Sequence, residues 1–359
     1  METTTTIPSK ETKIAANPPQ IGPAGSTPDL LRISDLTVQY LVGKSTKSAV
    51  ENVSFTIPST GYTIGVVGES GSGKTTTGLS IMRLIEPPGR ISNGSIKYNG
   101  KEVMKFREER LRRFRWEDVA MVFQSAMNSL SPVKTVVDHI VEVLLQHNRK
   151  NNFSKEEARE RAIALLEEVG ISKERANAYP HELSGGMRQR VVIAMAMALS
   201  PKILIADEPT SALDVVVQQQ ILDLVKKEIT ERGLSLIFIT HEIALLEGLV
   251  ENVAVMFAGE IVEMGKLESV ISNPKHPYTE MLLGSLLTLD SDRESVLKIN
   301  ATLGGETSQI GGANIIPKVG CKFANRCKYA FDRCRVEEPQ LILRKDGNGA
   351  LIACHKYSS

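Results

Sequence analysis

The sequence has 359 residues, too many for one small domain, and this length fits one large domain with smaller appendages. Hydrophobic residues make up 42% of the chain, which is enough to form a substantial core, and charged residues make up 24%. The formal net charge is +1, so the charge balance gives no indication that the protein binds nucleic acid. The longest apolar stretch, residues 191–199, is less than half of the ~20 residues that a membrane-spanning helix needs.

Two segments have a biased composition. Residues 1–28 are rich in Thr and Pro and contain neither a basic start nor an apolar stretch. They therefore lack the pattern of a signal peptide, and we expect a flexible tail on a cytoplasmic protein that reaches membranes only through partners. Residues 105–113 mix Lys and Arg with Glu, which favours a solvated helix face over a polyanion site.

The first elements expected after the tail are two strands and a helix. Residues 31–40 alternate apolar and polar side chains, which predicts a strand. Residues 63–67 are a short apolar run that leads into a Gly-rich loop, and a helix follows over residues 74–85 until Pro87 and Pro88 stop it. A phosphate-binding loop requires this order of strand, loop and helix.

Residues 105–200 are expected to be mostly helical. Apolar positions at helical spacing predict one helix over residues 156–169, which ends at Gly170. A second helix begins beside Ser184, whose hydroxyl is a suitable cap, and it stops before Pro201.

Strands return in the next part of the chain. Residues 203–206 and 236–240 are apolar runs that flank an amphipathic helix over residues 215–230. This alternation predicts a parallel sheet covered by helices. Residues 295–318, rich in Gly, Asn and Thr, are expected to form a linker to the C-terminal segment.

The Gly-rich loop matches the phosphate-binding pattern G-x-x-x-x-G-K-S/T. Its glycines let backbone N–H groups turn inward around a β-phosphate, and the following helix adds its positive N-terminal end. Lys74 is expected to neutralise β- and γ-phosphate oxygens, and the Thr75 hydroxyl to bind Mg²⁺. A chance Gly-rich turn is the alternative, and the flanking strand and helix argue against it. The residues expected at the nucleotide are Gly68, Glu69, Ser70, Gly71, Ser72, Gly73, Lys74, Thr75 and Thr76.

Polar side chains also follow the two later strands. Asp207 and Glu208 come directly after one strand, where Asp207 is expected to hold Mg²⁺ through a water and Glu208 to act as general base. His241 follows the other strand and is expected to donate a hydrogen bond to the γ-phosphate. Paired acids at a strand end are often a plain turn, and an isolated histidine is usually structural. The nearby phosphate loop favours the functional roles over these structural ones, because ligands bind at the carboxyl ends of parallel strands.

A Leu-Ser-Gly-Gly turn at residues 183–186 precedes the helix expected to begin beside Ser184. Such a turn at a helix N-terminus can bind an anion, and an ordinary helix cap is the alternative. One chain cannot easily fold this turn onto a nucleotide bound at its own Lys74, so we expect it to act on a second chain.

With these motifs in this order, residues 29–290 resemble the ATP-binding subunits of ABC transporters. The resemblance implies an α/β fold with a RecA-like P-loop NTPase core, an ABC antiparallel β-region and a helical subdomain at about residues 106–196. It also implies ATP hydrolysis in a head-to-tail dimer, with ATP held between one phosphate loop and the opposing 183–186 turn. Further roles implied by the resemblance belong to Tyr40 at adenine, Gln124 at Mg²⁺ and the water, Ser184, Gly185, Gly186 and Gln189 in the signature, and Asp214 between the two sites.

Three other segments resemble the dipeptide/oligopeptide importer ATPases in particular: residues 123–132, residues 273–279 and the cysteine-containing C-terminal region. Ser131 and Trp116 depart from that subgroup without touching a phosphate contact. The resemblance implies import of peptides, or of related solutes such as oligosaccharides or nickel. It also implies a second, homologous and non-identical ATPase subunit, two membrane permease subunits, an external solute-binding protein and a peripheral location on the cytoplasmic face of the plasma membrane.

All four cysteines lie near the C-terminus, at Cys321, Cys327, Cys334 and Cys354. In a reducing compartment such a cluster favours a metal over disulfides, although the spacing lacks the C-x-x-C pairs of most structural zinc sites. Four thiolates suit zinc or a 4Fe–4S cluster, and plain reduced thiols remain a third interpretation. The resemblance favours the cluster, so residues 291–359 are expected to be a small metal-bearing extension. His355 is a spare candidate ligand, although a bystander role is favoured for it.

Two functions from other classes compete with the transport interpretation. One is a soluble ABC ATPase of DNA repair or translation, which usually carries two cassettes or long insertions that this chain lacks. The other is an iron–sulfur regulatory protein that binds ATP without transport. Co-purification with membrane subunits would separate both from an importer subunit.

Overall fold

The computed structural model describes residues 28–147, 153–211, 213–290, 316–317, 319–344 and 349–357. The expected tail and linker lie outside these residues, except for positions 28, 316 and 317. The strands are β1 Leu31–Val42, β2 Ser45–Ile57, β3 Thr63–Val67, β4 Gly89–Tyr98, β5 Lys101–Glu102, β6 Val119–Val122, β7 Ile203–Asp207, β8 Ser235–Thr240, β9 Asn252–Phe257, β10 Glu260–Lys266, β11 Ile342–Leu343 and β12 Leu351–Ile352. The helices are α1 Lys74–Ile81, α2 Glu108–Arg113, α3 Val136–Gln146, α4 Lys155–Glu168, α5 Gly185–Met197, α6 Val215–Arg232, α7 Leu267–Ser272, α8 Pro277–Asp290 and α10 Asp332–Val336.

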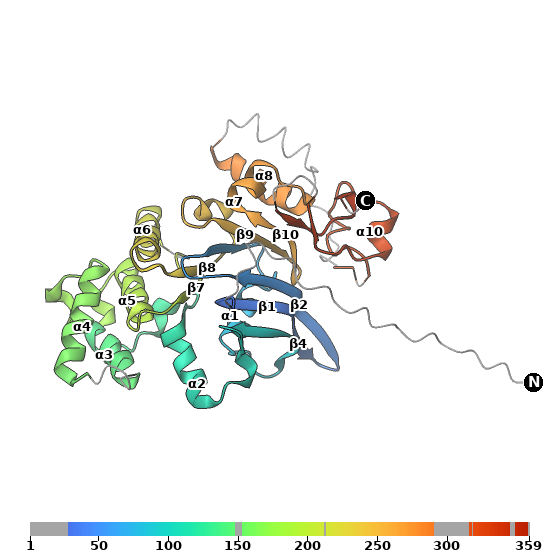
Figure 1. The fold of residues 1–359 in the computed structure, drawn as a ribbon. Helices are drawn as coiled ribbons and strands as arrows, with labels where there is room; N and C mark the ends of the chain where they lie inside the picture. Colours follow the sequence, from blue (N-terminus) through green and yellow to red (C-terminus); the bar gives the residue numbers. More distant parts are fainter. Residues whose placement is uncertain are drawn as a thin grey trace, which may run out of the picture.

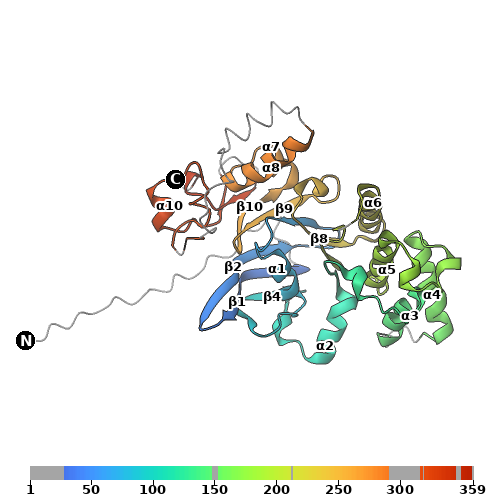
Figure 2. The ribbon, with the colours of Figure 1, turned by 180° about the vertical axis from the view of Figure 1, so that it is seen from behind.

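Among the described residues, the main sheet has eight strands in the order β11-β12-β10-β9-β3-β8-β7-β6. Figures 1 and 2 show β8, β9 and β10 of this sheet from opposite sides. Strands β9, β3, β8, β7 and β6 run parallel, whereas β10, β12 and β11 extend the sheet with antiparallel pairs. Every residue of β3, β7 and β8 is buried, which explains why these strands are continuous apolar runs. The parallel sheet expected from the sequence is therefore confirmed, with the strand that leads into the phosphate loop at its centre.

A second sheet of four antiparallel strands, in the order β2-β1-β4-β5, packs on one face of the main sheet. Alternate residues of the parallel strands divide between two cores because successive side chains of a strand point to opposite faces. Ile205 and Ile239 belong to the core shared with the antiparallel sheet, together with Ile81 of α1. Leu204 and Phe238 face the core formed with α3, α4, α5 and α6.

The region expected to be mostly helical contains one strand of the main sheet. Strand β6 has the sequence Val-Ala-Met-Val, is fully buried and pairs in parallel with β7. The sequence did not predict it, because a short apolar run cannot be distinguished from a buried helix segment by its periodicity. The 105–113 segment behaves as expected, since most of its charged side chains are exposed and only Leu111 is buried in α2.

Side-chain caps set where several helices begin. Ser184 caps α5 by accepting a hydrogen bond from the Met187 N–H at 3.3 Å, as the sequence predicted. Ser154 and Glu157 form a capping box at the start of α4. Helix α1 ends at Ile81, four residues before the expected end.

The C-terminal segment is attached to the main sheet rather than separate from it. Strand β12 pairs with β10, and a buried ion pair joins Arg344 to Glu263 of β10 at 3.5 Å. Glu263 also accepts hydrogen bonds from the backbone N–H groups of Lys275 and His276, which fixes the turn before α8. Within the described residues, none of the helices is both long and apolar enough to cross a bilayer.

Candidate active site

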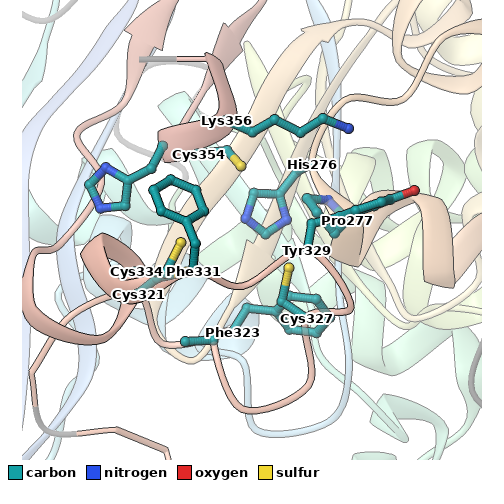
Figure 3. Close-up of a pocket in the computed structure, with 12 residues that line it drawn as sticks. His276, Pro277, Cys321, Phe323, Cys327, Tyr329, Phe331, Cys334, Cys354 and Lys356 are labelled. Atoms are coloured by element: carbon teal, nitrogen blue, oxygen red, sulfur yellow. The ribbon is translucent and has the colours of Figure 1, made fainter. Parts of the chain in front are cut away.

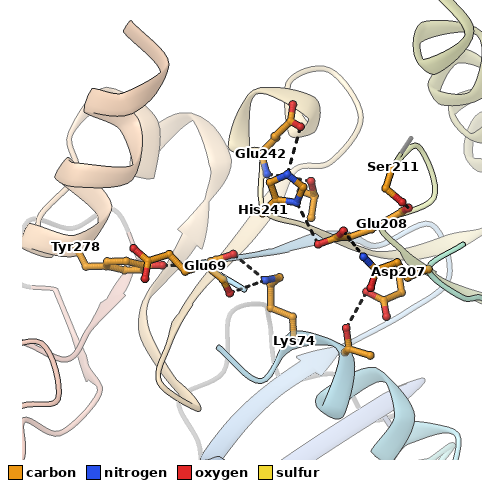
Figure 4. Close-up of polar contacts among 12 residues, drawn as sticks. Glu69, Lys74, Asp207, Glu208, Ser211, His241, Glu242 and Tyr278 are labelled. Atoms are coloured by element: carbon orange, nitrogen blue, oxygen red, sulfur yellow. Dashed lines mark hydrogen bonds and ion pairs between the residues drawn. The ribbon is translucent and has the colours of Figure 1, made fainter. Parts of the chain in front are cut away.

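The expected phosphate loop lies between β3 and α1, at the carboxyl edge of the main sheet (Figure 4). Lys74 opens α1, and its ammonium group donates hydrogen bonds to the carbonyls of Gly68 at 2.7 Å and Glu69 at 2.9 Å. Gly73 has φ +100°, and a Cβ there would lie 2.5 Å from the Ala49 carbonyl, so only glycine fits without a rearrangement. The loop therefore curls around a buried ammonium group at the N-terminus of a helix, which is the arrangement that binds phosphate.

Burial shapes the electrostatics of this loop. It lowers the pKa of Lys74, although the carboxylates of Glu208, Asp207 and Glu69 act in the opposite direction. The hydroxyl of Ser72 is buried and has no hydrogen-bond partner among the residues that the structure describes. A phosphate group would supply partners for the ammonium and for this hydroxyl, so the loop suits a nucleotide.

Two oxygen-bearing side chains meet beside the loop. The Thr75 hydroxyl donates a hydrogen bond to Oδ1 of Asp207 at 3.2 Å. Asp207 is only 1% exposed, and burial raises its pKa while the Thr75 hydrogen bond opposes the shift. A hydroxyl and a carboxylate side by side are hard oxygen donors of the kind that Mg²⁺ prefers.

Glu208 lies where three loops come together, each of which follows a parallel strand of the main sheet. Its carboxylate accepts a hydrogen bond from Nε2 of Gln124 at 2.9 Å and lies 3.1 Å from Nδ1 of His241 (Figure 4). Its backbone has φ +45° and is held by the N–H bond to the Ile239 carbonyl at 2.9 Å. The structure therefore brings Gln124 to Glu208 and His241. The sequence placed Glu208 and His241 at strand ends, whereas Gln124 was assigned by the family resemblance alone.

The signature turn lies elsewhere. Helix α5, which begins after Ser184, packs against α3, α4 and α6, and both ribbon views place it among these helices and apart from α1 (Figures 1 and 2). A Cβ at Gly186 would lie 2.3 Å from Cγ1 of Val217, so glycine lets α5 and α6 approach closely. Gln189 is buried on the same helix, at 2% exposure, whereas Ser184 itself is exposed.

Two other predicted residues have clear local roles. Asp214 caps α6 by accepting a hydrogen bond from the Val217 N–H at 2.9 Å. Tyr40 is half-buried near the end of β1, where a Cβ at Gly89 would lie 2.6 Å from its ring. The described structure thus shows the aromatic ring against the antiparallel sheet.

None of the four cysteines forms a disulfide, and all four line one small cavity of about 20 Å³ in the C-terminal segment (Figure 3). Aromatic rings, including those of Phe323 and Phe331, line the same cavity. Burial raises the pKa of Cys321 to about 11 and also raises the pKa values of Cys327 and Cys354. No group of three or more His, Cys, Asp or Glu side chains in the described part of the chain is arranged to hold a metal ion. The expected metal-bearing extension is therefore not shown: its thiols share a cavity but do not converge.

Two contacts to the phosphate loop were not predicted. The Tyr278 hydroxyl accepts a hydrogen bond from the Glu69 N–H at 2.8 Å, and Arg326 donates two hydrogen bonds to the Glu69 carboxylate. These residues lie 209 and 257 positions away from Glu69 along the chain. No local pattern could have indicated them.

Comparison with known proteins agrees with this geometry. Residues 50–211 match the family described as ABC transporter, and residues 262–334 match the one described as Oligopeptide/dipeptide transporter, C-terminal region. The oligopeptide transport ATP-binding protein AppD of Bacillus subtilis (strain 168) is 41% identical over 331 residues, which cover 91% of this chain and 97% of AppD. The dipeptide transport ATP-binding protein DppD of Escherichia coli (strain K12) is 40% identical over 328 residues, covering 91% and 96% respectively.

A solved structure of an ATP-binding cassette has a similar fold. The ATP-binding cassette MJ0796, a dimer in a post-hydrolysis state bound to ADP and Pi, aligns with a TM-score of 0.59 at 31% identity. The alignment covers 66% of this chain and 98% of that cassette. The chain has the ABC cassette fold, and it belongs to the ABC transporter family as one of its ATP-hydrolysing, ATP-binding subunits.

Proposed function

We propose that this subunit hydrolyses ATP to drive the import of peptides through a membrane transporter. The proposal of ATP hydrolysis rests on one observation: the side chains of Gln124, Glu208 and His241 converge beside the phosphate loop. The peptide cargo rests on AppD and DppD, whose names describe oligopeptide and dipeptide transport. Oligosaccharides and nickel are the other cargo classes that the resemblance implies.

We assign the role of general base to Glu208. Its carboxylate would polarise a water that attacks the γ-phosphorus and would take up the proton, while ADP leaves as the other product. Gln124 and His241 each contact a different oxygen of this carboxylate, so they hold its plane in one orientation. Thr75, Asp207 and Gln124 would hold Mg²⁺, which neutralises phosphate charge when it is bound.

We also propose that a second ATPase subunit, homologous and non-identical, completes each site. Ser184 is exposed at the N-terminus of α5, and the half-buried Gly185 beside it has no side chain to cover its backbone N–H, which would bind an anion. Nearby on α6, Val215 is 81% exposed and Val216 is 68% exposed. Apolar side chains beside such an anion-binding turn support a surface that another subunit covers.

The remaining partners in this proposal are two permease subunits and an extracellular solute-binding protein, with the ATPase on the cytoplasmic face of the plasma membrane. Reconstitution of all these components in proteoliposomes tests it. We expect uptake of a labelled dipeptide that requires ATP and stops when Lys74 is replaced by Met. Uptake of nickel or of an oligosaccharide without uptake of peptide would contradict the cargo assignment.

We propose in addition that the four cysteines hold a metal centre, either a 4Fe–4S cluster or, as the second candidate, one zinc ion. Four thiols around one cavity support both, since soft thiolate ligands bind either. Either centre would require the thiols to move toward a common point, because no three of them are arranged around one in the described part of the chain.

Metal analysis of protein purified without oxygen decides between these centres. A cluster predicts about four irons and four sulfides per chain with visible absorption, and zinc predicts one zinc without iron. The Cys327→Ser variant should lose either centre. Arg333→Met is the matched control, because it changes the same segment and leaves all four thiols in place. Metal-free protein in which all four thiols react with a thiol reagent would contradict the proposal.

A further inference from the structure

The C-terminal segment reaches into the phosphate loop at Glu69, the residue that follows Gly68. The guanidinium of Arg326 donates to both oxygens of the Glu69 carboxylate, from one terminal nitrogen at 2.8 Å and from the other at 2.7 Å. The Glu69 N–H donates to the Tyr278 hydroxyl at 2.8 Å, so the backbone of the residue is fixed as well as its side chain (Figure 4). Residues far apart in the sequence therefore determine where this acidic side chain lies.

Aromatic rings hold the Arg326 side chain in place independently of Glu69. Its guanidinium carbon lies 5.5 Å from the ring centroids of both Phe257 and Phe323. These two rings are in edge-to-face contact, with centroids 5.2 Å apart, and the Tyr278 ring lies 4.7 Å from that of Phe257. These rings already orient the planar guanidinium of Arg326. Little side-chain conformational entropy is therefore lost when the guanidinium pairs with the Glu69 carboxylate.

Attachment of the C-terminal segment does not depend on this pair. Lys322 binds Glu51 and Glu260, at 2.7 Å in each case. The buried ion pair between Arg344 and Glu263 joins the segment to β10 as well. Since these contacts already hold the segment on the sheet, the pair at Glu69 has a consequence other than anchoring.

The negative charge of Glu69 bears directly on ATP binding. A carboxylate in a phosphate loop repels a triphosphate, and the Glu69 carbonyl already lies 2.9 Å from the Lys74 ammonium that phosphate would contact. We propose that Arg326 is a positioning residue for ATP binding, which neutralises Glu69 and turns its carboxylate away from the bound phosphates. The inference concerns the ATPase site that defines the family and is independent of the cargo.

Steady-state ATP hydrolysis by the full-length chain in its transporter tests this inference. Arg326→Met leaves an unpaired carboxylate in the loop, so we expect the KM for MgATP to rise about five-fold, which corresponds to about 1 kcal/mol, while kcat changes less than two-fold. Replacing Glu69 by Gln in the same chain removes the repelling charge. The double variant Glu69→Gln/Arg326→Met should therefore return the KM to within about two-fold of the parent value.

Two further variants separate charge neutralisation from a structural role. Arg333→Met removes a comparable Arg–Glu pair, with Glu337, in the same segment, and it should leave the KM unchanged. Glu69→Gln alone is the reference for the double variant: once the repelling charge is gone, Arg326 has nothing left to neutralise, so the two variants should have KM values within about two-fold of each other. If Arg326→Met fails to fold, Arg326→Gln takes its place, because it removes the same positive charge and keeps an amide that can donate to Glu69. An unchanged KM in the folded Arg326 variant, or a double variant with a KM well above that of Glu69→Gln, would overturn the proposal.

Discussion

Replacing Glu208 by Gln is expected to preserve ATP binding and to lower the turnover of ATP by about 10²- to 10⁴-fold. The amide keeps the size of the side chain and can still contact Gln124 and His241, but it cannot take a proton from water. Bound ATP should then persist, so the variant should accumulate as a closed, ATP-bound dimer. Phosphate release, nucleotide affinity and molecular mass in the presence of MgATP are the measurements.

Glu242→Gln is the matched control for this prediction. Glu242 lies 3.5 Å from the other ring nitrogen of His241, and its side chain is about half exposed. We expect its turnover to stay close to that of the parent, because its carboxylate contacts the histidine from the side away from Glu208. Full turnover in Glu208→Gln, or an equal loss in Glu242→Gln, would remove Glu208 as the base.

Lys74→Met is expected to weaken ATP binding roughly ten- to hundred-fold, because a charged donor to phosphate is lost. Its stability should not fall. Burial lowers the pKa of Lys74, which means that the folded protein disfavours the charged group and that an apolar side chain of similar length avoids this cost. Nucleotide titration and urea unfolding of the same protein measure both effects.

Exposed Lys97 provides the comparison, since Lys97→Met removes the same charge from β4, in the antiparallel sheet. That variant should bind ATP like the parent. A folded Lys74→Met protein with parental ATP affinity would contradict the assignment of Lys74 to the phosphates. A large loss of stability without a loss of affinity would instead indicate a structural lysine.

The sequence predicted those parts of the fold that local chemistry determines. Strands β3, β7 and β8 are fully buried apolar runs, and the phosphate loop has a fixed order of glycines and lysine, so both could be predicted. The placement of His241 beside Glu208 followed from a rule about the carboxyl ends of parallel strands, whereas Gln124 was assigned by the family resemblance alone. Strand β6 could not be predicted, because four buried apolar residues carry no periodicity that distinguishes strand from helix.

Contacts between distant parts of the chain were beyond sequence reasoning for a different reason. The pair between Arg326 and Glu69 depends on how β12 docks on β10 and on how the rings of Phe257 and Phe323 orient the guanidinium. The cysteines show the converse, since their number suggested a metal centre but their spacing did not determine which side chains converge. Tertiary packing determines both the pair between Arg326 and Glu69 and the arrangement of the four thiols.

The account depends most on the claim that ATP is hydrolysed between two subunits, one contributing Lys74 and the other a turn like that at Ser184. Turnover per ATPase subunit should be measured for the purified chain held as a monomer, confirmed by its molecular mass, and for the assembled transporter under the same conditions. We expect the monomer to bind MgATP but to hydrolyse it far more slowly than the assembly. A monomer that hydrolyses ATP as fast as the assembly would contradict the account.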